Sequence, residues 1–244
     1  MKKMIILLLW LPGFVSAACE DPPAPEVNWS NCDKSGAALS GADLRNAVLQ
    51  GINLTGADLT GARLEGTDLG RATLVDALLV AAQMKKARLV NADFTRANLS
   101  KADLRGARLD VGDFSDANFS QARMDKSRGY RAVFVKANFS QASLQESEFE
   151  EADFSQANLS DANLSGSDLV QASFRQANLK AANLTKAKLT EANLTDANFS
   201  DANLYQADLT DAEITGLQYS GANLSYTRWV DRSRCRKGSV GECR

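Results

Sequence analysis

A small residue recurs at every fifth position of this chain, and a large apolar residue follows it two places later. The stretch Ala152 to Ser225 shows the pattern best: from Ala157 the sequence reads Ala-Asn-Leu-Ser-Asp and then Ala-Asn-Leu-Ser-Gly. The five-residue period is uninterrupted between Ala37 and Trp229. An α-helix needs apolar contacts three and four residues apart, and a plain strand needs alternation of two. A period of five fits neither, so it predicts a chain that turns a corner after every fifth residue.

Four such sides make a square coil of twenty residues, and residues twenty apart in this sequence match one another. Asparagines that repeat at the spacing between coils can share amide hydrogen bonds, as ladders do in stacked sheets. Stacked rings gain contact area without opening voids. The asparagine column is Asn98, Asn118, Asn138, Asn158, Asn178 and Asn198, and the phenylalanine column is Phe94, Phe114, Phe134, Phe154 and Phe174.

With units of the form Ala, then Asp or Asn, then Leu and two variable residues, the chain resembles the pentapeptide-repeat family. The pattern persists for 38 consecutive units, Leu39 through Leu224, and covers about four-fifths of the chain. The resemblance implies an all-β fold, a right-handed quadrilateral parallel β-helix of about nine and a half coils, capped at both ends. It also implies that the central Leu or Phe and the preceding Ala line the interior.

The sequence divides into four segments. Residues 1–17 read as a secretory signal peptide, with the basic start Met1-Lys2-Lys3, a short apolar core and small residues before a cleavage site. The apolar run is too short to span a bilayer, and an N-terminal membrane anchor is the alternative. The mature chain has no other run of that kind. Its predicted segments are an N-terminal cap over 18–35, the repeat helix over 36–230 and a C-terminal cap over 231–244.

The four cysteines lie outside the repeat, one pair near each end. Export favours oxidation, so we expect disulfides. Three connectivities are open, of which the local one joins Cys19 to Cys32 and Cys235 to Cys243. Each short loop would then contribute about 2–4 kcal/mol to the free energy of unfolding. Lipid attachment at Cys19 is an alternative, although Ser16 stands where such a site prefers a large aliphatic residue. We expect a periplasmic or secreted protein.

The sequence offers no catalytic constellation. It contains no histidine, which removes His-based triads and the ordinary zinc site. Its carboxylates occupy outward positions of the repeat. Gly51, Gly56, Gly61 and Gly66 recur as in a phosphate loop, but no Gly-Lys-Ser/Thr follows, and they stand at corner positions. We predict a protein that is not an enzyme and has no cofactor and no metal.

Charge is spread unevenly along the repeat. The formal charge is −2, which does not indicate a nucleic-acid binder. Ala81 to Lys136 holds twelve basic and six acidic residues, whereas Ala137 to Glu213 holds four basic and thirteen acidic. Seven of the twelve basic residues fall on one side of three consecutive coils. They form either a solvated face or a patch for an acidic protein, a sugar acid or a lipid head group. The candidate anion-binding patch is Lys85, Lys86, Arg88, Arg105, Arg108, Lys126 and Arg128.

One unit departs from the rule. Gly129 stands at a central position, between Leu109 and Phe149 in its column, and Tyr130 follows it. This irregular coil is either a gap that Phe149 fills or a kink or cleft in the middle of the rod. In the first case, Gly129→Leu is expected to stabilise a regular column.

The leading interpretation is an exported, non-enzymatic rod that serves as a structural or binding module. We expect its partner to be an unknown protein or an anionic ligand rather than nucleic acid, and the rod to be a monomer or a homodimer. The best-known branch of the family supplies the alternative: cytoplasmic DNA mimics that bind type II topoisomerases and shield them from quinolones. The acidic half, Glu146 to Glu213, favours this alternative, but the export signal, the near-neutral charge and the uninterrupted period do not.

Overall fold

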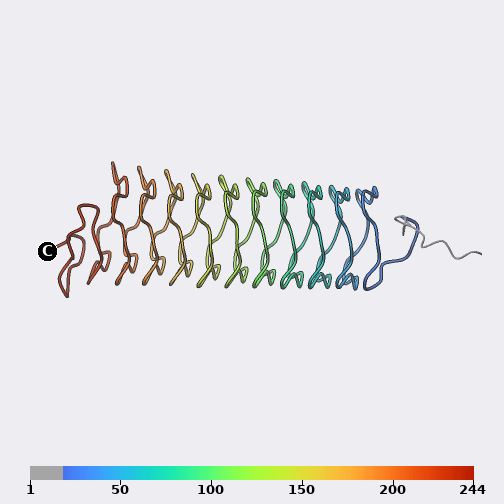
Figure 1. The fold of residues 1–244 in the computed structure, drawn as a ribbon, viewed down its shortest axis with the longest axis horizontal. Helices are drawn as coiled ribbons and strands as arrows, with labels where there is room; N and C mark the ends of the chain where they lie inside the picture. The colour runs from blue at the N-terminus through green and yellow to red at the C-terminus, as the bar shows by residue number, and fades with distance from the viewer. Residues whose placement is uncertain (1–18) are drawn as a thin grey trace, which may run out of the picture.

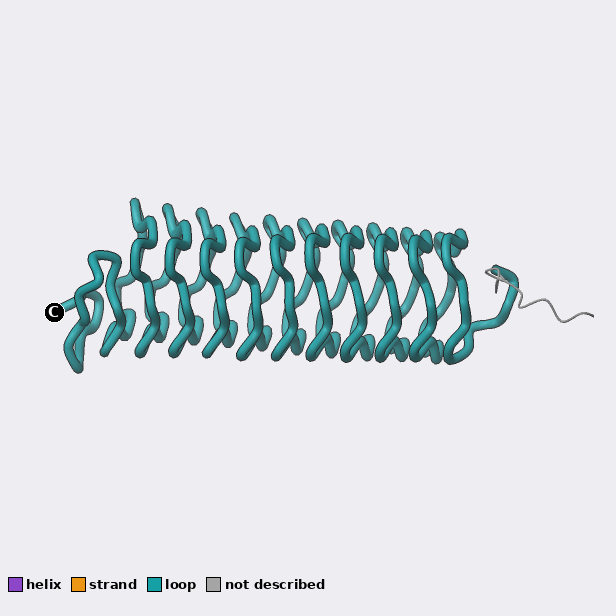
Figure 2. The backbone as a smooth tube through the Cα atoms, viewed as in Figure 1, coloured by secondary structure: helices purple, strands orange, loops and turns teal. Residues whose placement is uncertain are grey.

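The computed structural model describes residues 19–244, so the predicted signal peptide lies outside the described residues. The chain winds as a four-sided parallel coil with twenty residues per turn (Figure 1). Within residues 19–244 there is no helix, and each side contributes a single bridged residue rather than a longer strand (Figure 2). The bridges form four series: face A from Asp43 to Asn223, face B from Asn28 to Arg228, face C from Asp33 to Glu213 and face D from Ala38 to Gln218.

Each side is short because the chain turns at every fifth residue. From Glu26 to Tyr226, the residue at this corner has a φ between +51° and +72°. The next amide donates to the carbonyl of the central residue, as Ala47 does to Leu44 at 3.1 Å. This is the geometry of a type II β-turn, which requires a positive φ at its third position. The recurrent glycines stand at these corners, as predicted.

Where Asp or Asn precedes the central residue, its side chain satisfies a backbone donor. In the described coils, the amide two residues ahead of it donates to no backbone carbonyl of a neighbouring coil. The side chain accepts that hydrogen bond instead, as Asn98 does from Ser100 at 3.1 Å and Asp58 from Thr60 at 2.9 Å. These are Asx turns. The repeat prefers Asp and Asn at this position because the amide would otherwise lack a partner.

The interior is filled by two inward residues of each unit, and both are buried along most of the rod. The predicted phenylalanine column is confirmed: consecutive rings from Phe94 to Phe174 stack with centroids 4.9–5.2 Å apart. A second stack, Phe119 on Phe139 at 4.8 Å, adds to it. Such close packing leaves the preceding inward position room for little more than alanine.

The predicted asparagine column is confirmed on face D. Each side chain from Asn118 to Asn198 donates through Nδ2 to Oδ1 of the asparagine one coil earlier, at 3.2–3.4 Å. A shorter ladder on face A, which was not predicted, includes the bond from Asn183 to Asn163 at 3.2 Å. These bonds join successive coils from Asn98 onward and therefore tie neighbouring coils together.

The coil begins earlier than predicted. Parallel bridges start at Asn28, inside the segment 18–35 that we predicted to be a cap. Val27 and Trp29 fill the inward positions there, and both are buried. The sequence pattern did not predict these first sides because neither residue is the usual alanine or leucine of the repeat.

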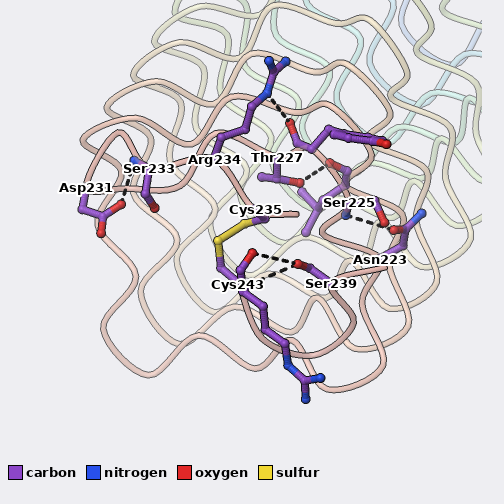
Figure 3. Close-up of a disulfide and its surroundings, with 12 residues drawn as sticks. Asn223, Ser225, Thr227, Asp231, Ser233, Arg234, Cys235, Ser239 and Cys243 are labelled. Carbon is purple, nitrogen blue, oxygen red and sulfur yellow. Dashed lines mark hydrogen bonds between the residues drawn. A yellow bond between two sulfur atoms is a disulfide. The ribbon is translucent and has the colours of Figure 1, made fainter. Parts of the chain in front are cut away.

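The four cysteines lie in two pairs at disulfide distance. Cys19 pairs with Cys32 and Cys235 with Cys243, with Cα atoms 5.5 and 4.8 Å apart. Of the three connectivities, the structure therefore contains the local one. Near the second pair the chain reverses onto faces A and B of the last coil (Figure 3). The antiparallel bridges that hold it there join Asn223 to Val240 and Arg228 to Arg234.

Candidate functional site

The seven basic residues of the predicted patch lie along one edge of the rod. They belong to three successive coils and meet where face A turns into face B, and we call this surface the basic edge. Its members are Arg88, Arg108 and Arg128, stacked as a bridged column on face B, and Lys85, Lys86, Arg105 and Lys126 at the end of face A.

Carboxylates accompany most of the basic edge. Lys85 and Arg105 share Asp103, with N–O distances of 3.5 and 2.6 Å. Lys86 is the one member for which the described residues provide no salt bridge. Exposed ion pairs of this kind are weak and screened, so they reduce the field of the edge without removing it. The other pairs are Arg88 with Asp68 at 3.7 Å, Lys126 with Glu146 at 3.4 Å, and Arg108 and Arg128 with Asp110 at 3.2 and 3.0 Å.

Asp110 is the only acidic side chain that is buried among residues 19–244. Its Oδ1 accepts from Nε of Arg128 at 3.0 Å and from the amide of Tyr130 at 3.2 Å. Its Oδ2 accepts from the guanidinium of Arg108 at 3.2 Å. A buried carboxylate is tolerated only when it is paired and hydrogen-bonded. Two arginines of the predicted patch therefore hold a structural carboxylate, a role that the outward position of Asp110 did not suggest.

The unit at Gly129 and Tyr130 keeps a regular backbone. The amide of Gly129 donates to Glu148 at 2.8 Å, and its carbonyl accepts from Ala132 at 3.1 Å. A Cβ atom added to Gly129 would lie 2.5 Å from Cε1 of Phe149. The ring of Phe149 thus occupies the space, and there is no room for a leucine. The expectation that Gly129→Leu stabilises the rod is wrong.

Tyr130 belongs to a small polar cluster beside that unit. Its hydroxyl donates to Oε1 of Glu151 at 3.0 Å, and Nε of Arg131 donates to Oε2 at 2.6 Å. The bond from Arg131, followed by that from Tyr130, lowers the pKa of Glu151, and the bond to Glu151 raises the pKa of Tyr130. Both shifts favour the ordinary protonation states, an ionised Glu151 and a neutral Tyr130. Acid–base catalysis, in contrast, needs a pKa close to the working pH.

Three surface hollows lie on face B or on the basic edge. The first, about 280 Å³, adjoins Gly70, Arg71 and Arg88. The second, about 520 Å³, surrounds Gly106 on the basic edge. The third, about 430 Å³, extends from Tyr130 across the next coil and is acidic, because Glu148, Glu150 and Glu151 line it. In the first two hollows, a glycine occupies a position at which the next coil has a larger residue: Gly70 precedes Val90, and Gly106 precedes Lys126. Because the glycine has no side chain, the surface is hollow there.

The described part of the chain shows neither a metal site nor a membrane span. Among residues 19–244, no group of three or more His, Cys, Asp or Glu side chains is placed to hold an ion. None of the described residues forms a helix with the length and apolar character needed to cross a bilayer.

The same repeat is found in known proteins. A family model described as pentapeptide repeats matches most of the chain, and no curated protein matches it. The matched residues are 37–76, 72–110, 113–150, 137–176, 157–196, 177–216 and 187–225.

Among solved structures, the chain is similar to HetL from the cyanobacterium Nostoc, a pentapeptide repeat protein involved in heterocyst differentiation regulation. The two are 27% identical, with a TM-score of 0.69 over 86% of this chain and 92% of that one. This similarity supports a right-handed quadrilateral β-helix. QnrB1, a plasmid-mediated fluoroquinolone resistance protein, also matches at 20% identity over 62% of this chain and 80% of that one. Its TM-score is 0.44.

Proposed function

Because the chain belongs to the pentapeptide repeat family, we propose that it is a non-enzymatic rod that binds an anionic partner through the basic edge. The observation that carries this proposal is the hollow of about 520 Å³ on the basic edge, which is lined by four cations and one carboxylate. A concave surface offers a partner more contact area and more specificity than a flat surface does. Arginine and lysine donors suit carboxylate and phosphate groups, so the partner is an acidic protein or an anionic ligand.

A binding role agrees with the packing of the rod. The central residues are buried, so side chains that reach a partner must come from the outward positions. HetL, which is similar to this chain, is a pentapeptide repeat protein involved in heterocyst differentiation regulation. We therefore place the function of this chain on its surface, without catalysis and without a cofactor.

We propose that the rod works outside the cytoplasm, after removal of residues 1–17. Two cysteine pairs at disulfide distance support an oxidising compartment. The segment with Cys235 and Cys243 would act as the C-terminal cap, the pair Cys19 and Cys32 would fasten the start of the chain to the first coil, and the rod would exist as a monomer or a homodimer. The test is the mass and the thiol count of protein purified from fractions of its native host. A full-length, reduced, cytosolic species would contradict export.

The binding proposal is tested by reversing charge on the basic edge. The triple variant Lys85→Glu, Lys86→Glu, Lys126→Glu leaves Arg108 and Arg128 on Asp110. Immobilised wild-type and variant rods are exposed to host extract, and the captured molecules are identified by mass spectrometry. We expect acidic partners on the wild type and their loss on the variant.

The matched control reverses three lysines elsewhere on the rod, Lys136, Lys180 and Lys186, and should capture the same partners as the wild type. Identical capture by the wild type and the basic-edge variant would refute the proposal.

The topoisomerase alternative makes an opposite prediction. A DNA mimic inhibits DNA supercoiling by gyrase or protects the enzyme from quinolones, whereas a basic-edge binding rod does neither. We expect the purified chain to leave supercoiling unchanged in both assays. Protection at micromolar rod concentration would favour the alternative and move attention to the acidic half.

A further inference from the structure

We infer that the hollow around Gly106 is a binding site for a phosphate group. This inference rests on the proposed function and specifies its chemistry, because it assigns one hollow of the basic edge to one class of anion. The residues that line the hollow are Lys85, Lys86, Arg105, Gly106, Asp125 and Lys126.

The hollow exists because Gly106 interrupts a column of long side chains. Gly106 stands at a corner, and the same corner carries Lys86 one coil earlier and Lys126 one coil later. A Cβ atom built on Gly106 would meet only Cγ of Lys86, at 3.6 Å, so the space above the glycine is open. Coils are stacked at about 4.8 Å, which separates the two lysine backbones by roughly 9.6 Å. A phosphate placed between the two lysines can accept a charge-assisted hydrogen bond of about 2.8 Å from each ammonium group. The two bonds together span most of the separation between the coils that carry the lysines.

Charge in the hollow is predominantly positive. Four cations and one carboxylate line it. The carboxylate, Asp125, accepts hydrogen bonds from the hydroxyl of Ser143 and from the amide of Gln145, both in the next coil. Lys86 has no salt-bridge partner among the described residues, and Lys126 has only an exposed one, Glu146. The two ammonium groups on either side of Gly106 are thus the donors that remain available.

The available donors favour phosphate over carboxylate. Arg105 could grip a planar carboxylate with its guanidinium fork, but that fork already binds Asp103 through two bonds, at 2.8 and 2.6 Å. The ammonium groups act as point charges without a planar preference. A phosphate monoester carries a charge of about −1.5 to −2 at neutral pH and offers three acceptor oxygens, so two ammonium groups attract it more strongly than a single carboxylate.

The test combines two probes with matched variants. Inorganic phosphate is titrated while the amide resonance of Gly106 is followed by NMR. Vesicles of phosphatidylcholine, with or without phosphatidic acid, are sedimented with the rod. The site variants are Gly106→Glu and the double variant Lys86→Gln, Lys126→Gln. Their controls are Gly166→Glu, a corner of the same column with φ +69° against +67° and its nearest contact also at 3.6 Å, and the double variant Lys136→Gln, Lys186→Gln.

We expect the wild type and both controls to bind. Removing two exposed ion contacts should weaken binding about five- to tenfold, and Gly106→Glu should abolish it. Binding of inorganic phosphate without sedimentation identifies a soluble phosphate ester, and sedimentation only with phosphatidic acid identifies a lipid head group. A wild type that binds neither probe, or a Gly106→Glu variant that binds like the wild type, overturns the inference. The latter result leaves the basic-edge proposal standing, because that proposal fails only if the triple charge reversal changes nothing.

Discussion

Faces B and D are built on the same backbone and differ in their side chains. The amide of Leu99 donates to Asn118 on face D at 2.7 Å, and that of Leu109 donates to Arg128 on face B at 2.6 Å. On face D, six consecutive coils present asparagine at the bridged position. The corresponding residues of face B are Arg88, Arg108, Arg128, Glu148, Asp168 and Lys188.

The difference separates what the fold requires from what it permits. Coils stack equally well on both faces, so the backbone does not demand the charges of face B. A uniform column adds stability through repeated contacts, whereas a varied column gives a partner features to distinguish. Substitutions on face B that only remove an exposed charge should therefore leave the stability of the rod unchanged. Substitutions of irregular residues that take part in packing should lower the free energy of unfolding.

The largest effect is expected from Gly129→Leu. The leucine would collide with the ring of Phe149, which lies 2.5 Å from the position of a Cβ atom. Overpacking of a filled core typically costs up to about 3 kcal/mol, so the free energy of unfolding should fall by that amount in a urea titration.

A second variant distinguishes collision from a general intolerance of the site. The double variant Gly129→Leu, Phe149→Ala moves the bulk from one coil to its neighbour and should recover much of the lost stability. If the double variant is as unstable as the sum of the two single variants, the two side chains do not compete for one space.

Asp110→Ala should have the next largest effect. It leaves Arg108 and Arg128 facing each other without a counter-ion, and it removes the acceptor of the Tyr130 amide. Loss of a buried acceptor should lower the free energy of unfolding by about 2 kcal/mol. Asp113→Ala, an exposed carboxylate nearby, is the control and should change stability much less. Equal losses would mean that Asp110 is not a special member of face B.

Asn138→Ala tests the uniform face. The substitution removes the bond from Asn138 to Asn118 and the bond that it accepts from Asn158. It also frees the amide of Ser140. Because partly buried bonds of this kind contribute about 0.5–1.5 kcal/mol each and water replaces part of them, we expect the free energy of unfolding to fall by about 1 kcal/mol in thermal denaturation. A loss as large as that of Asp110→Ala would remove the distinction between the two faces.

Much of this architecture could be predicted because its rules recur. The columns that contain Phe94 and Asn98 repeat every twenty residues, so a count along the sequence aligns the coils. The start of the coil was missed because Trp29 fills an inward position without resembling the repeat. The role of Asp110 was missed because its burial depends on how two arginines fold over it, and register alone does not specify side-chain conformation. The same holds for Gly129, whose space belongs to a ring from the next coil.

The smallest effect concerns pH and separates the amide ladder of face D from the paired carboxylate of Asp43 on face A. The hydrogen bond from Arg45 is the main cause that lowers the pKa of Asp43 to about 2, from an ordinary value of 3.8. A carboxyl group whose pKa is depressed in the folded state contributes stability above its unfolded pKa and loses it as the pH falls towards the folded value. The melting temperature should therefore decline between about pH 4 and pH 2, and Asp43→Asn should make that decline shallower. Asn138→Ala carries no titrating group, so its deficit relative to the wild type should stay constant over the same range. A deficit that grew with acidity would show that the amide ladder depends on neighbouring carboxylates, and its contribution to stability would then not be independent of their ionisation.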